Sequence, residues 1–106
     1  MKIRIYQINH EMDRNKYLFR NLEYIYGHSS GRFPEEIYRL VFEGETLADN
    51  LDDLYNCSNQ MLQSNLLPRR LSVSDIFEII HPNGKSSFYF VDSIGFILIP
   101  IDGLNM

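Results

Sequence analysis

Residues 76–100 constrain the fold most, because they are strand-like throughout and are broken at only two places. The first break is His81-Pro82-Asn83-Gly84, and the second is Asp92-Ser93. Asn-Gly between two apolar runs is the strongest short-range hairpin signal, since both residues tolerate the positive φ of a type I′ turn. The segment therefore predicts three antiparallel strands in succession.

A turn centred on Asn83-Gly84 also predicts the register of the first two strands. One face would be wholly apolar and pack on the core, and the other would be mixed and half solvated. A four-residue loop, favoured if Pro82 ends the ladder, would leave this register unchanged. The predicted facing pairs are Phe77 with Phe90 and Ile79 with Phe88 on the apolar face, and Ile76 with Val91, Glu78 with Tyr89 and Ile80 with Ser87 on the mixed face.

The last of the three successive strands can be placed in the sheet, and two further segments are predicted as strands. Residues 94–99 are apolar on both faces, which predicts a strand covered on both sides and interior to the sheet, with Gly95 at a bulge or a close backbone approach. Residues 3–8 alternate and begin almost at the first residue, so we expect this strand to be inserted between others. Residues 38–43 are predicted as a strand or the approach to one, which Gly44 is expected to end.

The helical signals are shorter. Residues 17–26 fit both helical and strand spacing, and we favour a helix that ends near Gly27. Pro34-Glu35-Glu36 predicts one brief helical turn, with proline first and carboxylates near the helix amino terminus. Asn50 with Asp53 predicts an N-cap for a helix whose apolar stripe is Leu51, Leu54, Tyr55, Met61 and Leu62.

This order of elements predicts an α+β fold for residues 1–106. We expect a single small domain with a mostly antiparallel sheet, a C-terminal three-strand meander and two or three short helices packed beside it. The chain has 106 residues, 44% of them hydrophobic, which is enough for a modest core without disulfides.

Charge and composition narrow the possible partners. The net charge of −4 argues against a general nucleic-acid or anionic-membrane surface, which needs a basic excess, and leaves a basic partner possible. The single cysteine fits a reducing compartment. No signal-peptide pattern and no apolar run approaching the ~20 residues of a membrane span is present. We therefore expect a cytoplasmic protein.

The sequence contains no pattern that indicates catalysis. His10, His28 and His81 have no second ligand at metal-binding spacing, and no glycine-rich phosphate loop is present. Cys57 lies near the apolar stripe and is more simply a small buried side chain than a nucleophile. The acidic pairs at 35–36 and 52–53 are typical of helix starts. We predict no catalytic residue, no metal and no cofactor.

The segment at 69–75 supplies most of the candidate interaction residues. Ser72-Val73-Ser74-Asp75 is typical of a tight turn held by side-chain-to-backbone bonds, and the alternative is a polar site lined by its side chains. Arg69-Arg70 fits either a solvated loop or a contact for an anion. Of the tyrosines, we expect some of Tyr24, Tyr26 and Tyr89 to be exposed. The candidate interaction surface is Arg69, Arg70, Ser72, Ser74, Asp75, Tyr89 and Asp92.

Several motifs resemble the YodL-like domain family of bacterial proteins. They are Ile5-Tyr6-Gln7, Phe19, Leu51-Asp52-Asp53-Leu54-Tyr55, Arg70-Leu71-Ser72-Val73-Ser74-Asp75-Ile76 and Tyr89-Phe90-Val91-Asp92-Ser93-Ile94-Gly95-Phe96. The sequence departs from the family at 60–67, where members often carry a polar, proline- and aspartate-containing link and this chain is more apolar.

The resemblance supports the first of three hypotheses about function. Such domains occur alone or inside larger proteins of mobile elements, and no family catalytic residues carry over. It implies an accessory protein-interaction domain that binds a host or element-encoded protein. The alternative is a nucleic-acid-associated module in element transfer or antirestriction, which would use Arg69 and Arg70. An enzyme using Ser72, Asp75 and Asp92 is the third hypothesis.

Overall fold

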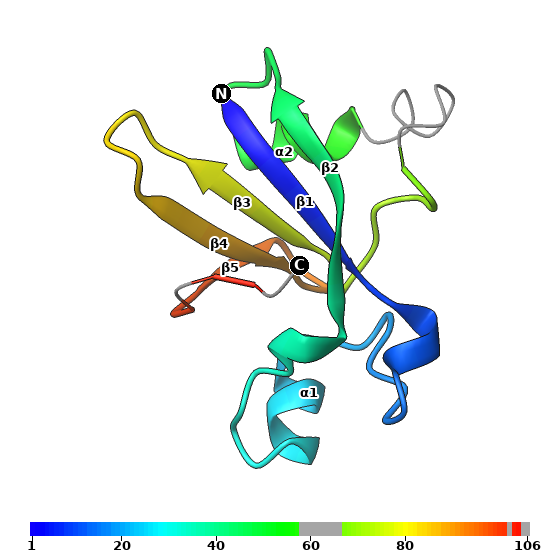
Figure 1. Ribbon diagram of the computed structural model, residues 1–106. Coiled ribbons are helices and arrows are strands. Elements are labelled where there is room, and N and C mark those ends of the chain that lie inside the picture. The colour runs from blue at the N-terminus through cyan, green and yellow to red at the C-terminus, as the bar shows by residue number, and fades with distance from the viewer. Residues whose placement is uncertain (58–66, 102, 105–106) are drawn as a thin grey trace.

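The computed structural model describes residues 1–57, 67–101 and 103–104, and within them the main element is a five-stranded antiparallel sheet (Figure 1). The strand order is β2-β1-β3-β4-β5. The last three strands are neighbours in sequence order, as the predicted meander requires. The fold is α+β and mostly sheet. The strands are β1 (Lys2–Ile8), β2 (Tyr38–Glu45), β3 (Ile76–Ile80), β4 (Ser86–Val91) and β5 (Phe96–Ile99).

The helices are short, and side-chain caps begin both α-helices. They are α1 (Leu22–His28) and α2 (Leu51–Asn56), together with the 3-10 turns η1 (His10–Met12) and η2 (Glu35–Ile37). The side chain of Asn50 accepts a hydrogen bond of 2.9 Å from the amide of Asp53, which confirms the predicted N-cap. Cys57 caps the other end of α2 and is half-buried. Met61 and Leu62, which completed the predicted stripe, lie outside the described residues.

The helix favoured at residues 17–26 begins only at Leu22. The preceding loop is held by Asp13, whose carboxylate accepts hydrogen bonds from the amides of Tyr17 and Leu18 at 2.8 and 2.9 Å. Lys16 and Phe19 both have positive φ, so no helix can form through them. The loop is therefore fixed by side-chain bonds rather than by helical periodicity.

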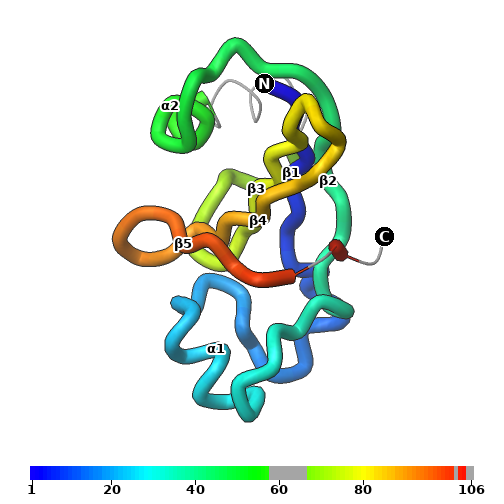
Figure 2. The backbone as a smooth tube through the Cα atoms, turned by 90° about the vertical axis from the view of Figure 1, so that its left-hand side faces the viewer, coloured from blue at the N-terminus to red at the C-terminus, as the bar shows by residue number. Residues whose placement is uncertain are grey.

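Both faces of the sheet are covered, and two cores result. Alternate residues of β1 point to opposite faces: Tyr6 and Ile8 enter one core, while Ile3 and Ile5 enter the other. Helix α1 covers the first core and α2 the second, and Figure 2 shows the strands between these two helices. β1 lies between β2 and β3, as expected for an inserted strand.

The predicted register of the β3–β4 hairpin is wrong by one residue. Phe77 lies opposite Tyr89, not Phe90. The loop has three residues, because the amide of His81 donates to the carbonyl of Lys85 at 2.8 Å. Pro82 suits the second position of a type I turn, and Gly84, at φ +85°, supplies the left-handed residue that follows it.

A one-residue shift moves every side chain of β4 to the other face of the sheet. Phe88 and Phe90 therefore pack in the first core with Tyr6, and Phe77 packs in the second. Glu78, expected on a half-solvated face, is buried and accepts a hydrogen bond of 2.6 Å from the hydroxyl of Tyr6. Burial and this bond raise the pKa of Tyr6.

The predicted place of the last strand is also wrong, because β5 is an edge strand rather than an interior one. Leu98 is 60% exposed and Ile94 is 92% exposed. Gly95 has φ +78° and lies in the turn before β5, where its carbonyl accepts from the amide of Asp92 at 3.0 Å. At the opposite edge, β2 continues through Gly44, which pairs with Ile3 and does not end the strand. An apolar composition on both faces thus did not indicate position within the sheet.

Candidate functional site

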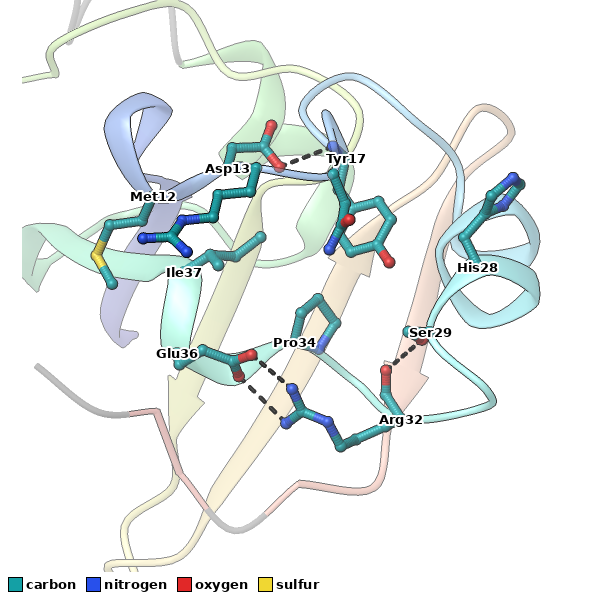
Figure 3. Close-up of a pocket in the computed structure, with 11 residues that line it drawn as sticks. Met12, Asp13, Tyr17, His28, Ser29, Arg32, Pro34, Glu36 and Ile37 are labelled. Atoms are coloured by element: carbon teal, nitrogen blue, oxygen red, sulfur yellow. Dashed lines mark hydrogen bonds and ion pairs between the residues drawn. The ribbon is translucent and has the colours of Figure 1, made fainter.

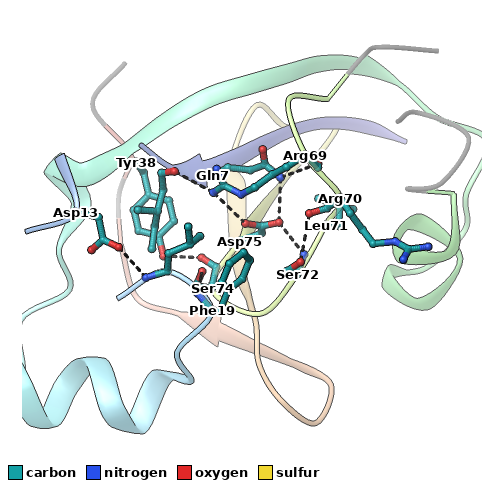
Figure 4. Close-up of polar contacts among 12 residues, drawn as sticks. Gln7, Asp13, Phe19, Tyr38, Arg69, Arg70, Leu71, Ser72, Ser74 and Asp75 are labelled. Carbon is teal, nitrogen blue, oxygen red and sulfur yellow. Dashed lines mark hydrogen bonds and ion pairs between the residues drawn. The ribbon is translucent and has the colours of Figure 1, made fainter. Parts of the chain in front are cut away.

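Three segments far apart in sequence meet beyond the carboxyl end of β1: residues 13–24, 69–75 and 91–95. The amide of Phe19 donates to Ser74 Oγ at 3.1 Å (Figure 4). The amide of Ser74 donates to the carbonyl of Val91 at 2.9 Å, and the amide of Leu22 donates to Asp92 Oδ1 at 3.2 Å. These bonds join all three segments, and we call the three segments together the loop junction.

Asp75 organises the turn at the centre of the loop junction. Its carboxylate accepts from the amide of Ser72 at 2.9 Å, while its own amide donates to the carbonyl of Ser72 at 3.2 Å. Ser74 has φ +88°, and its carbonyl accepts from the hydroxyl of Tyr38 at 2.6 Å. The structural interpretation of Ser72-Val73-Ser74-Asp75 is therefore confirmed. Ser74 and Asp75 are fully buried and present no surface.

A buried polar cluster supports this turn from beneath (Figure 4). Gln7 Nε2 donates to Asp75 Oδ2 and to the carbonyl of Arg69, both at 3.2 Å. Arg69 Nη2 donates to the carbonyl of Ile8 at 2.9 Å and lies 4.0 Å from Asp75 Oδ1. Arg69 is thus used internally and is not free to bind an external anion.

The polar cluster is only partly satisfied. Among the described residues, Gln7 Oε1, Arg69 Nε and Asp75 Oδ1 are buried without a hydrogen-bond partner. Burial raises the pKa of the Asp75 carboxyl to about 7, although hydrogen bonds from Ser72 and Gln7 and the charge of Arg69 act in the opposite direction. Burial also lowers the pKa of the Arg69 guanidinium. Chemically, this is a carboxyl group that can change charge near neutral pH beneath the surface of the loop junction.

The outer side of the loop junction is partly apolar. Phe19 is 57% exposed, although its backbone is held at φ +69°. Two shallow pockets meet at Val73 and Ser93. The first, about 250 Å³, is also lined by Phe19, Arg20, Asn21 and Tyr24. The second, about 270 Å³, is also lined by Asp52, Tyr55, Val91, Asp92, Gly95 and Phe96.

A separate pocket of about 160 Å³ lies between η1, α1 and η2 (Figure 3). Three of its charged side chains, those of Asp13, Arg32 and Glu36, already have partners. The guanidinium of Arg32 forms two hydrogen bonds with the carboxylate of Glu36 and thereby lowers the pKa of that carboxyl. Asp13 accepts the two loop amides described above. These three side chains are used in local structure, and the loop junction, where segments far apart in sequence meet, is the stronger candidate.

The structure brings most of the predicted surface residues together, but at different depths. Arg70 is exposed and Ser72 half-buried on the 69–75 segment, and Asp92 is half-buried beside the first turn of α1. Tyr89 lies apart from them, in the middle of β4 opposite Leu98, and is half-buried.

Sequence reasoning missed part of the site. Tyr24 and Tyr26 are half-buried, and the aromatic side chain exposed at the site is Phe19. Phe19 belongs to the motifs of the family resemblance but is not among the predicted site residues. Its exposure depends on a positive φ that no local residue pattern signals. Gln7 and Tyr38 were missed for a related reason, since their partners are distant in sequence.

Two other kinds of site are absent from the part of the chain that the structure describes. Within it, no three His, Cys, Asp or Glu side chains are grouped so that they could hold a metal ion. None of its helices has the length and apolar character needed to cross a membrane.

Comparison with known proteins places the chain in a family. The family model of the YodL-like domain matches residues 2–101. The match extends from the start of β1 past the end of β5, so it includes all three segments of the loop junction. Curated proteins and solved structures gave no match. The chain belongs to the YodL-like domain family.

Proposed function

We propose that this protein is a non-enzymatic protein-interaction domain and that the loop junction is its binding surface. Phe19 carries the proposal, because an aromatic side chain that is 57% exposed sits on a backbone with φ +69°. Bulky residues rarely adopt this conformation, which costs about 1–3 kcal/mol and tends to occur at functional sites. Exposed aromatic side chains on a fixed backbone are frequent anchors of protein interfaces.

The surroundings of Phe19 have the composition of an interface. Val73 is half-buried beside it, and Ile94 is 92% exposed on the neighbouring turn. Polar and charged side chains lie around these apolar groups, among them Arg20 and Asp52. An apolar centre with a polar rim is the usual arrangement of a protein-binding surface.

The partner we propose is a protein of the bacterial cytoplasm, encoded by the host or by a mobile element. A nucleic-acid partner is less well supported, because phosphate-driven binding needs several cations on one surface. Arg69 donates to the carbonyl of Ile8, which leaves Arg70 as the exposed arginine of the predicted basic doublet. The net charge of −4 also opposes binding to phosphates.

Affinity capture from a host lysate, followed by mass spectrometry, tests the proposal. Wild type is compared with Phe19→Ala, and Leu47→Ala serves as the control because Leu47 is 99% exposed on a different loop. We expect one stoichiometric protein with wild type and with the control, and at least about a tenfold loss with Phe19→Ala. Equal capture by Phe19→Ala, or a mixture of nucleoproteins that nuclease removes, would contradict the proposal.

A further inference from the structure

The two edges of the sheet differ in how they are protected against pairing. The β2 edge carries the charged side chains of Arg39, Glu43 and Glu45, and its ladder with β1 is interrupted by a bulge next to Ile5. Charges and bulges are two of the devices that keep an edge strand from pairing with another chain. The β5 edge lacks the charges, since residues 93–100 contain no charged residue.

β5 forms one edge of the sheet (Figure 1), and exposed apolar side chains are concentrated on β5 and the turn before it. Six large hydrophobic side chains are exposed in the described part of the chain, and three of them belong to β5 and its turn. They are Ile94, Ile97 and Leu98, at 92%, 37% and 60% exposure. Such a concentration on an uncharged edge strand marks a surface for pairing.

The hydrogen bonds of Val91 show which backbone groups of β4 face β5. Val91 uses both its N–H and its C=O on the β3 side, with Asp75 and Ser74. Backbone groups of successive strand residues point to alternate sides, so those of Phe90 point to β5. Phe90 lies opposite Ile97, and the backbone groups of Ile97 therefore point back to β4.

The same alternation exposes the backbone of the two residues on either side of Ile97. The N–H and C=O groups of Phe96 and Leu98 point away from β4, along an edge of the sheet that pairs with no other strand of the described residues. Groups at this spacing pair with an added polypeptide strand, parallel or antiparallel. The chemistry of the edge thus specifies an extended chain with apolar side chains as its ligand.

We propose that β5 pairs antiparallel with β5 of a second copy of this chain, about a twofold axis at Ile97. Leu98 then lies opposite Phe96 of the partner subunit, and Ile97 lies opposite the partner subunit's Ile97. Each copy contributes an N–H and a C=O from two residues, so about four hydrogen bonds close the pair. The two five-stranded sheets become one continuous sheet.

A second copy fits this edge because the strand complements itself. In the twofold register every facing pair is apolar, and no like charges meet across the interface. Pro100, which has no N–H, lies opposite the turn residue Ile94 of the partner subunit, so pairing ends where the strand ends on both sides. The pairing covers the three exposed side chains, and a twofold contact closes without further growth.

Sedimentation of the purified protein tests the proposal. A contact this small predicts a weak dimer, with a Kd of about 10–100 µM, so the concentration should range from about 5 µM to about 500 µM. We expect the apparent mass to rise from one copy to two across this range. Leu98→Lys should raise the Kd at least about tenfold, because two apolar side chains are lost at once.

Two further variants make the test specific. Leu98→Pro removes the outward N–H but not a bond to β4, so it should abolish the dimer while the fold remains. Leu47→Lys introduces the same charge at an exposed leucine away from β5 and should leave the Kd unchanged. Circular dichroism verifies that each variant is folded. If Leu98→Pro does not fold, the result for Leu98→Lys decides the test.

Three outcomes would overturn the proposal. If the apparent mass stayed at that of one copy at the highest concentration, the chain would not pair with itself, and the ligand of the β5 edge would be an extended segment of a different protein. Association that persists in both Leu98 variants would place the contact elsewhere. If Leu47→Lys weakened association as much as Leu98→Lys, association would depend only on net charge. The readout needs no partner protein, so it is independent of whether Phe19 anchors one.

Discussion

The raised pKa of Asp75 makes a quantitative prediction about stability and pH. The carboxyl is fully buried, and its pKa of about 7 lies roughly three units above that of an aspartate in an unfolded chain, about 3.9. Three units correspond to about 4 kcal/mol. Because the folded state holds this proton more tightly, the contribution is fully present below about pH 4 and is lost progressively as the pH rises to about 7.

Asp75→Asn isolates this contribution, because an amide does not titrate. The free energy of unfolding of wild type and of Asp75→Asn is measured by urea denaturation from about pH 4 to about pH 8. The value for the variant minus that for wild type should increase by about 4 kcal/mol over this range. All other titrating groups are shared and cancel in the difference. Asp52→Asn, which removes the same charge at an exposed position of α2, is the matched control.

Two results would refute this reasoning. A difference that stays constant with pH would mean that Asp75 titrates alike in the folded and unfolded chains. A difference that decreases as the pH rises would mean that Arg69, whose Nη2 lies 4.0 Å from Asp75 Oδ1, stabilises the carboxylate more than burial destabilises it. In that case the buried pair would contribute stability at neutral pH instead of costing it.

Two further predictions concern residues with positive φ. Measured by urea denaturation, the free energy of unfolding of Phe19→Gly should exceed that of Phe19→Ala by about 1 kcal/mol, because glycine adopts φ +69° without strain. The reverse order would show that the backbone there is not strained. Gly84→Ala should lower the free energy of unfolding, measured by thermal denaturation, by about 1–2 kcal/mol. The cost comes from the φ of +85° alone, because an added Cβ would meet no neighbouring atom. Gly27→Ala in α1 is the control and should stabilise the protein by up to about 1 kcal/mol. If Gly84→Ala and Gly27→Ala changed the stability equally, the three-residue hairpin loop would be contradicted.

Local patterns predicted the elements that local physics determines. The N-cap at Asn50, the brief turn after Pro34 and the alternation of β1 all depend on residues within a few positions of one another. The strands of the meander were also predicted in the correct order. Their register was not, because it depends on whether the loop after His81 has two, three or four residues, and an odd number reverses the faces of β4.

The site could be predicted only in part, because its contacts are long-range. The turn at Ser72–Asp75 is local and was expected from its own side chains. The burial of this turn depends on its hydrogen bonds with Gln7 and Tyr38, which are far away in the chain. Ser74 is therefore buried rather than exposed, and the adjacent surface is provided by Phe19, whose amide Ser74 holds.

Site-specific photocrosslinking tests most directly whether the loop junction binds a protein. The photoreactive residue p-benzoylphenylalanine replaces Phe19 in one variant and Leu47 in another, and both are irradiated in host cells. The account predicts one discrete crosslinked protein from position 19 and none from position 47. No crosslink at position 19, or the same crosslinked protein from both positions, would contradict it.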